Sequence, residues 1–213
     1  GAYLERLHGE DLPGPLKLTV ERQCLIANSP SRFTDGPGIH YALGVRPYSR
    51  FSAPMREIVG IFTHKEALEQ LGLGPVSLTP EEDEQLRELV IQAGNQGKER
   101  QRALDRAVRH LAIDTLLDKD LQLPLHERPV RSGTVLGLRP SRAYVRLDNP
   151  PLELKVYRED LETWAGSPLE LSEDEVVFNA RETGEPRLLM GQGISLRTEG
   201  KDPRRDRWRL MPV

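Results

Sequence analysis

The sequence predicts an α+β protein in which strands and long helices precede an all-β region. Three observations predict this class. Apolar residues recur at helical spacing in segments 54–71 and 79–117. From residue 130 onward, short runs of alternating apolar and polar residues are separated by turn residues. The pattern changes at the proline-containing segment 123–129, so we expect two domains, residues 1–125 and 126–213.

The first domain is expected to begin with strands. Apolar and polar residues alternate at residues 16–20, which predicts a strand there. A second strand is expected at residues 40–45, broken by Gly44 and ending near Pro47. Pro54 suits the first turn of the following helix, because its missing N–H would have no partner there.

A second helix is expected to begin at Thr79, a cap residue followed by Pro80 and by the capping-box glutamate Glu82. The acidic run at residues 81–84 has the composition of a metal site. Its position in the first helical turn instead favours a solvated segment that stabilises the helix dipole. Apolar residues then continue at helical spacing to about residue 117.

The second domain is expected to be a small barrel of the oligonucleotide/oligosaccharide-binding (OB) type, because it consists of short strands separated by turn chemistry. The strands are expected at residues 130–138, 143–147, 152–157, 176–178, 188–196 and 208–210, with a helical turn at 161–164.

Composition excludes several classes of protein. The net charge of -3 gives no global signature of nucleic-acid binding, so such binding must come from local clusters. The single cysteine, Cys24, excludes an internal disulfide framework and a zinc ribbon. The sequence has no P-loop, no nucleophile elbow, no paired histidines at metal-ligand spacing and no membrane-length apolar run. We therefore expect a cytoplasmic, soluble protein.

Three arginines, Arg46, Arg50 and Arg56, surround the expected helix start at Pro54. A cation in a first helical turn opposes the macrodipole, where an acidic residue is favoured by ~0.3–1 kcal/mol. Free amide donors, a positive helix end and an arginine together suit a phosphate group. The alternative is a surface arginine paired with Glu57 or another carboxylate.

A second basic cluster lies near the C-terminus. Small OB barrels bind single strands through a positive groove with aromatic stacking platforms, for which Tyr144, Tyr157 and Trp208 are candidates. The alternative is that these aromatic residues belong to the core and that the arginines lie in a solvated hairpin. The basic residues are Arg197, Lys201, Arg204, Arg205, Arg207 and Arg209.

Residues 48–58, YSRFSAPMREI, resemble the Y-x-x-F/W-T-S-P-I/L-R-R/K-Y signature of the RNase II/RNase R (RNB) exoribonuclease family. Residues 38–44, GIHYALG, are similar to its P-x-H-F/Y-x-L-G strand. Residues 143–147 and 191–196 are similar to strands of the S1-like OB domain that closes these proteins. The resemblance covers most of the chain and is weakest over residues 1–30.

The resemblance implies the C-terminal part of an RNB catalytic domain followed by an S1-like OB domain. It implies processive, Mg²⁺-dependent hydrolysis of single-stranded RNA from the 3′ end, which releases nucleoside 5′-monophosphates. Arg56 would contact the phosphate at the reactive end and stabilise the charge that develops in the transition state. The further RNA-binding residues would be His40, Tyr48, Arg50, Tyr144, Arg197, Arg204 and Arg205.

The sequence also departs from the family. Ser52 and Ala53 replace the threonine and serine of the signature, and Ile58 and Gly60 replace a tyrosine and an aspartate. The aspartate cluster that holds the family's metals lies before the matched region. We therefore expect the Mg²⁺ ligands outside this chain, in an N-terminal half of the RNB domain that would be its partner, and we expect the chain alone to be inactive.

Two other classes of function remain open. The chain is a non-catalytic RNA-binding or regulatory module if no aspartate cluster accompanies it. It is a structural scaffold if it does not bind single-stranded RNA in a salt-dependent manner.

Overall fold

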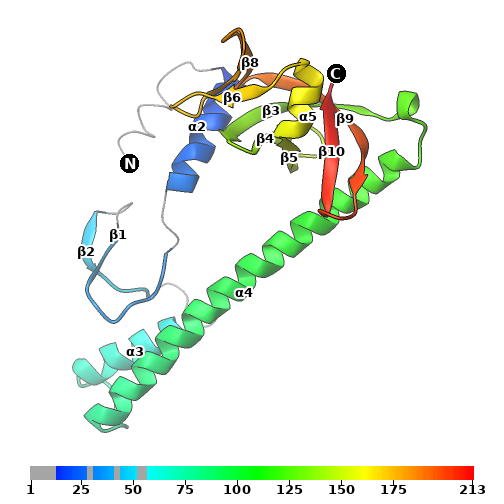
Figure 1. Ribbon diagram of the computed structural model, residues 1–213. Coiled ribbons are helices and arrows are strands. Elements are labelled where there is room, and N and C mark those ends of the chain that lie inside the picture. The colour runs from blue at the N-terminus through cyan, green and yellow to red at the C-terminus, as the bar shows by residue number, and fades with distance from the viewer. Residues whose placement is uncertain (1–12, 28–30, 41–43, 52–56) are drawn as a thin grey trace. The chain divides into compact units, whose positions relative to one another are not determined.

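The computed structural model describes residues 13–27, 31–40, 44–51 and 57–213. The chain forms two compact units, each described by itself below. The sheet unit comprises Gly1–Ser29 and Val108–Val213, and the helix unit comprises Pro30–Ala107. The predicted α+β class is confirmed, and the all-β region begins at Val130 as expected (Figure 1). The domains 1–125 and 126–213 remain a prediction, because the division into units follows packing and groups α2 with the C-terminal sheets.

The sheet unit contains two antiparallel sheets (Figure 1). The larger one has the strand order β10-β9-β3-β4-β5, and its two edge strands also contact each other. The smaller one has the order β6-β7-β8. Helix α5 (Arg158–Ala165) replaces the predicted helical turn. The strands are β3 (Val130–Arg139), β4 (Arg142–Leu147), β5 (Glu153–Tyr157), β6 (Leu169–Leu171), β7 (Val177–Ala180), β8 (Pro186–Leu189), β9 (Gly193–Asp202) and β10 (Arg207–Pro212).

The core of the sheet unit follows from the two-residue period of its strands. Along β4, buried and half-buried residues alternate without exception, which places Ala143, Val145 and Leu147 on the inner face. They pack in a cluster that also contains Phe178 of β7 and Leu117. Because these side chains are at most 2% exposed, the sheet unit has a continuous apolar core.

The strand predicted at residues 16–20 is wrong: this segment lies in helix α2 (Gly14–Ala27). Helix α2 contacts β3 through polar side chains. The apolar residues of α2 therefore do not recur at helical spacing. Thr19 is fully buried, with its hydroxyl 3.4 Å from the Val135 carbonyl oxygen. Gln23 donates a hydrogen bond of 2.8 Å to the Leu136 carbonyl oxygen. A Cβ at Gly137 would lie 2.9 Å from the Gln23 amide nitrogen, so a larger residue there would displace the ends of the Gln23 and Arg22 side chains.

Helix α4 (Pro80–Leu121) is a single element that contributes residues to both units. Its predicted start is confirmed, because the Glu82 amide donates to the Thr79 hydroxyl at 3.3 Å and the Thr79 amide donates to the Glu82 carboxylate at 2.9 Å. Near its end, Asp120 is 2% exposed and accepts hydrogen bonds from Arg131 (2.6 Å) and Thr198 (3.0 Å). These bonds fix the end of α4 to β3 and β9, and η1 (Leu125–Glu127) follows.

The helix unit contains strands β1 (Gly38–His40) and β2 (Val45–Tyr48), helix α3 (Ile58–Gln70) and the first part of α4. β1 and β2 are antiparallel and replace the single strand predicted at residues 40–45. The predicted helix start at Pro54 lies outside the described residues, and the described part of α3 begins after Glu57.

The helix unit packs through Gly94 of α4. A Cβ at this position would lie 2.7 Å from a methyl carbon of Val59 and 3.0 Å from the ring of Phe33, so only glycine allows this approach. Among the described residues of the unit, Val90 is the one buried hydrophobic side chain. Within the described part of the chain, no helix combines the length and apolar character needed to cross a membrane.

Candidate nucleic-acid interface

Three of the predicted RNA-binding residues line one cavity of about 430 Å³ in the helix unit. His40 comes from β1, Tyr48 from β2 and Arg50 from the segment that follows. Residues 31–36, α3 and α4 supply the other walls. The short antiparallel pairing of β1 with β2, in which Gly38 faces Tyr48, brings the three side chains to one place.

The rings of His40 and Tyr48 meet edge to face, with centroids 4.6 Å apart and an interplanar angle of 61°. Tyr48 is 37% exposed, so part of its ring remains open to a ligand. The Arg50 guanidinium lies 2.9 Å from the Glu57 carboxylate. The alternative given for Arg56 was an ion pair with the same glutamate. The Nε atom of Arg50 is buried without a hydrogen-bond partner among the described residues. Arg56, the predicted catalytic residue, lies outside the described residues.

Phe33 and Lys98 also line the cavity, and sequence reasoning missed both. The Asn95 side chain accepts a hydrogen bond from the Phe33 amide at 2.9 Å and donates one to the Phe33 carbonyl oxygen at 3.0 Å. The ammonium group of Lys98, one helical turn further along α4, lies 3.5 Å from the centroid of the Phe33 ring. More than sixty residues separate Phe33 from Lys98, so no local sequence pattern could have paired them.

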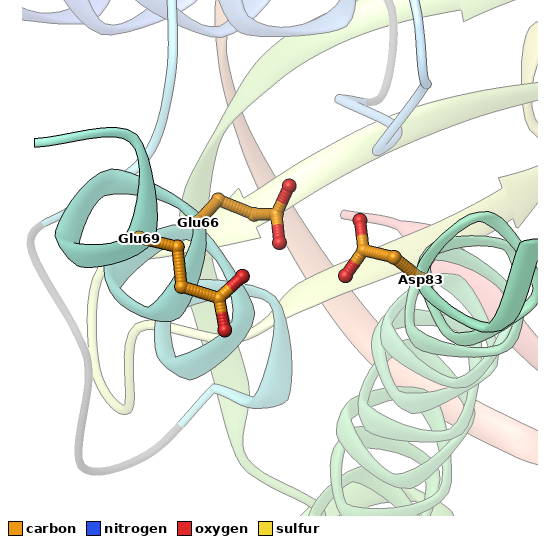
Figure 2. A group of neighbouring side chains, drawn as sticks. All are labelled: Glu66, Glu69 and Asp83. Carbon is orange, nitrogen blue, oxygen red and sulfur yellow. The ribbon is translucent and has the colours of Figure 1, made fainter. Parts of the chain in front are cut away.

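A group of three carboxylates lies where α3 and the first turn of α4 meet. Figure 2 shows the carboxyl groups of Glu66, Glu69 and Asp83 turned toward one another, and their oxygens lie within 4.8 Å. Asp83 belongs to the acidic run at residues 81–84, for which the sequence favours a solvated first turn. No local pattern indicates the convergence, because it depends on the packing of two helices.

Lys65 compensates this acidic group. Its ammonium nitrogen lies 2.9 Å from Glu66, 2.9 Å from Glu69 and 2.7 Å from Asp83. These bonds raise the pKa of Lys65, and the bond from Lys65 lowers the pKa of Asp83. A hard divalent cation needs several free oxygen ligands, whereas here an ammonium group already contacts all three carboxylates. The group therefore fits an ion-pair cluster and does not fit a Mg²⁺ site.

In the sheet unit, Tyr144 of β4 is half-buried beside α2. The guanidinium carbon of Arg22 lies 4.7 Å from the centroid of the Tyr144 ring. Arg22 is itself held by Glu153 of β5 through two hydrogen bonds of 2.7 Å. The face of β4 that carries the predicted stacking platform is thus contacted by a helix of the same unit. The role of Tyr144 in RNA binding stays a prediction.

The predicted basic residues of the sheet unit lie elsewhere. Arg197 on β9 pairs with Val130 at the start of β3, whereas Tyr144 pairs with Gly137, seven residues further along the same strand. At about 3.3 Å per residue, this separation is about 20 Å. The structure does not bring Tyr144 and Arg197 together.

Arg204 and Arg205 lie in the turn between β9 and β10, which bends around the Asp202 carboxylate. Arg204 is exposed. The Arg205 guanidinium contacts the carboxylate of Glu159 on α5 at 3.1 Å, and Arg207 contacts the same carboxylate. Hydrogen bonds from Arg207 and then Arg205 lower the pKa of Glu159. Much of the basic cluster is therefore compensated within its own unit.

Trp208 belongs to the core and is not an open platform, since it is 8% exposed. Its indole N–H donates to Asp114 of α4 at 2.7 Å, and Lys201 contacts the same carboxylate at 3.1 Å. Burial would raise the pKa of Asp114, but the bonds from Trp208 and Lys201 outweigh it and lower that pKa. The alternative of a core aromatic residue is confirmed here.

No family model and no curated protein matches this sequence. Solved structures do match. The structure of Mycoplasma genitalium RNase R in complex with ribose-methylated single-stranded RNA aligns with a TM-score of 0.76 and 16% identity, covering 97% of this chain and 31% of that chain. The apo form of the same protein aligns with a TM-score of 0.74, the same identity and the same coverage.

The chain thus spans about a third of the RNase R chains that it matches. At this identity, the likeness establishes the fold. The chain has the fold of the matched part of RNase R, which is the fold that the resemblance of its sequence to the RNase II/RNase R family predicted.

Proposed function

We propose that this chain forms the C-terminal part of a cytoplasmic exoribonuclease of the RNase II/RNase R type. The complete enzyme hydrolyses single-stranded RNA processively from the 3′ end to nucleoside 5′-monophosphates. Within it, the chain supplies an RNA-binding wall that includes His40, Tyr48 and Arg50, with Arg56 at the reactive phosphate. A part of the RNA further from its reactive end contacts the sheet unit, at Tyr144, Arg197, Arg204 and Arg205.

The observation that carries this proposal is the match to RNase R over 97% of the chain. One of the matched structures is a complex with single-stranded RNA. The cavity adds independent support, because three residues chosen from the sequence alone lie together on its walls.

Mg²⁺ would come from ligands outside this chain, in the partner half of the RNB domain. Bound there, it would supply charge stabilisation and an activated water for phosphodiester hydrolysis. This assignment is supported by the acidic cluster on α3 and α4, whose carboxylates are compensated by Lys65 and do not fit the ion.

The first experiment is Arg56→Ala in the complete enzyme. If Arg56 stabilises charge that develops in the transition state, kcat falls by about 10²–10³ while the affinity for RNA changes far less. Single-turnover cleavage of a labelled RNA together with its equilibrium binding measures the two effects. Arg46→Ala is the matched control, because Arg46 lies on β2 of the same stretch and is exposed. Equal turnover of parent and Arg56→Ala would contradict the assigned role.

A non-catalytic RNA-binding module is the second candidate, since the poor fit of the acidic cluster to a metal agrees with both functions. The two functions differ in what accompanies the chain. Closely spaced aspartates encoded upstream of Gly1 in the same reading frame support the enzyme. Their absence there supports the module.

A further inference from the structure

Lys98 of α4 is held in a fixed place on the wall of the cavity. Its ammonium nitrogen lies on the Phe33 ring, 3.5 Å from the centroid, and 3.4 Å from both the carbonyl and the hydroxyl oxygen of Ser31. Asn95 binds the backbone of Phe33 on both sides and so fixes the ring. A lysine that would otherwise be flexible is therefore pre-oriented, which lowers the entropic cost of a further contact.

The other basic side chains on the cavity wall have carboxylate partners. Arg32 contacts Glu99 at 3.5 Å, Arg50 contacts Glu57 at 2.9 Å and Arg87 contacts Asp83 at 3.3 Å. Within the described part of the chain, Lys98 forms no ion pair, and its contacts are a ring and two neutral oxygens. Its positive charge is thus not compensated by a carboxylate in direct contact.

The environment of Lys98 disfavours its charged form. Burial lowers its pKa, the charges of Arg50 and Arg102 lower it further, and Glu57 acts in the opposite direction. An anion that entered the cavity would instead favour the charged form of Lys98. Arg50 lines the same cavity, and its buried Nε atom has no hydrogen-bond partner among the described residues.

We propose that Lys98 is a phosphate-binding residue, and that it holds one phosphate of a single-stranded RNA in this cavity beside Arg50. The proposal rests on the proposed function and adds to it a residue that the sequence did not indicate. The cavity, at about 430 Å³, lies within the usual 300–1,000 Å³ of small-ligand sites. The half-open Tyr48 ring lies on the same wall and suits stacking with a base, which favours RNA over an acidic protein segment.

The test measures binding of a labelled, unstructured uridine oligomer to the 213-residue chain over a series of salt concentrations. Lys98→Gln should weaken binding at low salt by at least about tenfold, because a charge-assisted contact is lost. It should also reduce the slope of log K against log salt by about 0.7, the value for one phosphate contact on a single strand. Arg100→Gln is the matched control, since it removes the same charge from an exposed position on the same helix that does not line the cavity.

Lys98→Arg keeps the charge and should keep the slope, and it remains informative if Lys98→Gln fails to fold. Competition with polyglutamate separates phosphate from carboxylate recognition, and equally effective competition by polyglutamate would overturn the proposal. If Lys98→Gln changes neither the affinity nor the slope while the parent binds RNA, the proposal for Lys98 is also overturned. The proposed function would then still stand. Equal losses of RNA affinity in Lys98→Gln and Arg100→Gln would show that both residues act by diffuse electrostatic attraction. This result would also overturn the proposal for Lys98. A parent chain that binds no RNA would overturn both proposals.

Discussion

The two units differ in how their basic side chains are paired with carboxylates. In the sheet unit, several basic side chains pair with carboxylates of the same unit: Arg131 with Asp120, Arg22 with Glu153 and Lys201 with Asp114. In the helix unit, the basic and acidic groups around Lys65 are matched in the same way, but Lys98 faces a cavity without a carboxylate partner.

Apolar burial separates the units as well. The buried side chains of the sheet unit form one cluster, whereas the helix unit buries Val90 and leaves many large apolar side chains exposed in its described part. Among them are Ile61 and Leu68 on α3 and Leu89 and Leu104 on α4, each at least 47% exposed. The sheet unit thus has an apolar core of its own. The other region has the character of a surface that acts on, or is completed by, something else.

The largest effect should come from apolar burial within one helix. Leu117→Ala on α4 removes a side chain that is 1% exposed and packs in the sheet-unit core, so it should cost about 3–4 kcal/mol of unfolding free energy. Leu104→Ala on the same helix removes one that is 57% exposed and should cost no more than about 0.5 kcal/mol.

Chemical denaturation followed by tryptophan fluorescence measures the first change, because Trp164 and Trp208 both belong to the sheet unit. Circular dichroism of the helices measures the second. Similar costs for Leu117→Ala and Leu104→Ala would remove the contrast between the units.

A smaller effect is expected from the charge that fixes the end of α4. Asp120→Asn leaves Arg131 without its carboxylate partner in a largely buried place, so it should cost about 2–3 kcal/mol. Asp118→Asn makes the same change at an exposed position two residues earlier and should stay within about 0.5 kcal/mol. Denaturant midpoints of the two variants give the comparison, and a silent Asp120→Asn would show that this bond does not anchor the helix.

The smallest effect should come from the half-buried ion-pair cluster in the helix unit. The bond from Lys65 lowers the pKa of Asp83 from its ordinary 3.8, so its contribution to stability is present above that pH and is lost as the pH falls through the lowered pKa. Lys65→Gln removes the bond that lowers the pKa of Asp83 and leaves this carboxylate within 4.8 Å of two others, whose negative charges raise that pKa.

The Lys65→Gln variant should therefore melt at a lower temperature than the parent at pH 7, and the difference should shrink toward pH 5 as Asp83 of the variant binds a proton. Thermal melts at the two pH values measure this, with Lys155→Gln, an exposed lysine on β5, as the control. A difference that grows on acidification would contradict the assigned electrostatics.

Local patterns predicted the elements whose stabilising contacts are local. The capping box at Thr79 and Glu82 was found because both partners lie within one turn. Strand β4 was found because its alternation of apolar and polar residues reports burial on one face. The single strand expected at residues 188–196 is wrong, because β8 and β9 are separate strands there. Helix α2 was missed because its contacts with β3 run through Thr19 and Gln23, which are polar. β6 was missed because it has only three residues.

The candidate site depended on contacts that join distant segments. His40, Tyr48 and Arg50 were predicted through a motif, and they do share one cavity. The Phe33–Lys98 pair and the Glu66–Asp83 approach arise from packing between segments far apart in the sequence, so no spacing rule reaches them. The basic cluster near the C-terminus was misleading as a measure of free charge, because Glu159, on a different element, compensates Arg205 and Arg207.

The docking of α2 on β3 has a consequence for the order of events during synthesis. Ala27 leaves the ribosome roughly 100 residues before Val130, which at about 5–20 residues per second is a delay of about 5–20 s. During this time the surface around Thr19 and Gln23 has no sheet to contact, and the segment being made in the meantime has little core of its own. Helix α2 therefore has no packing partner in the nascent chain until β3 has been translated.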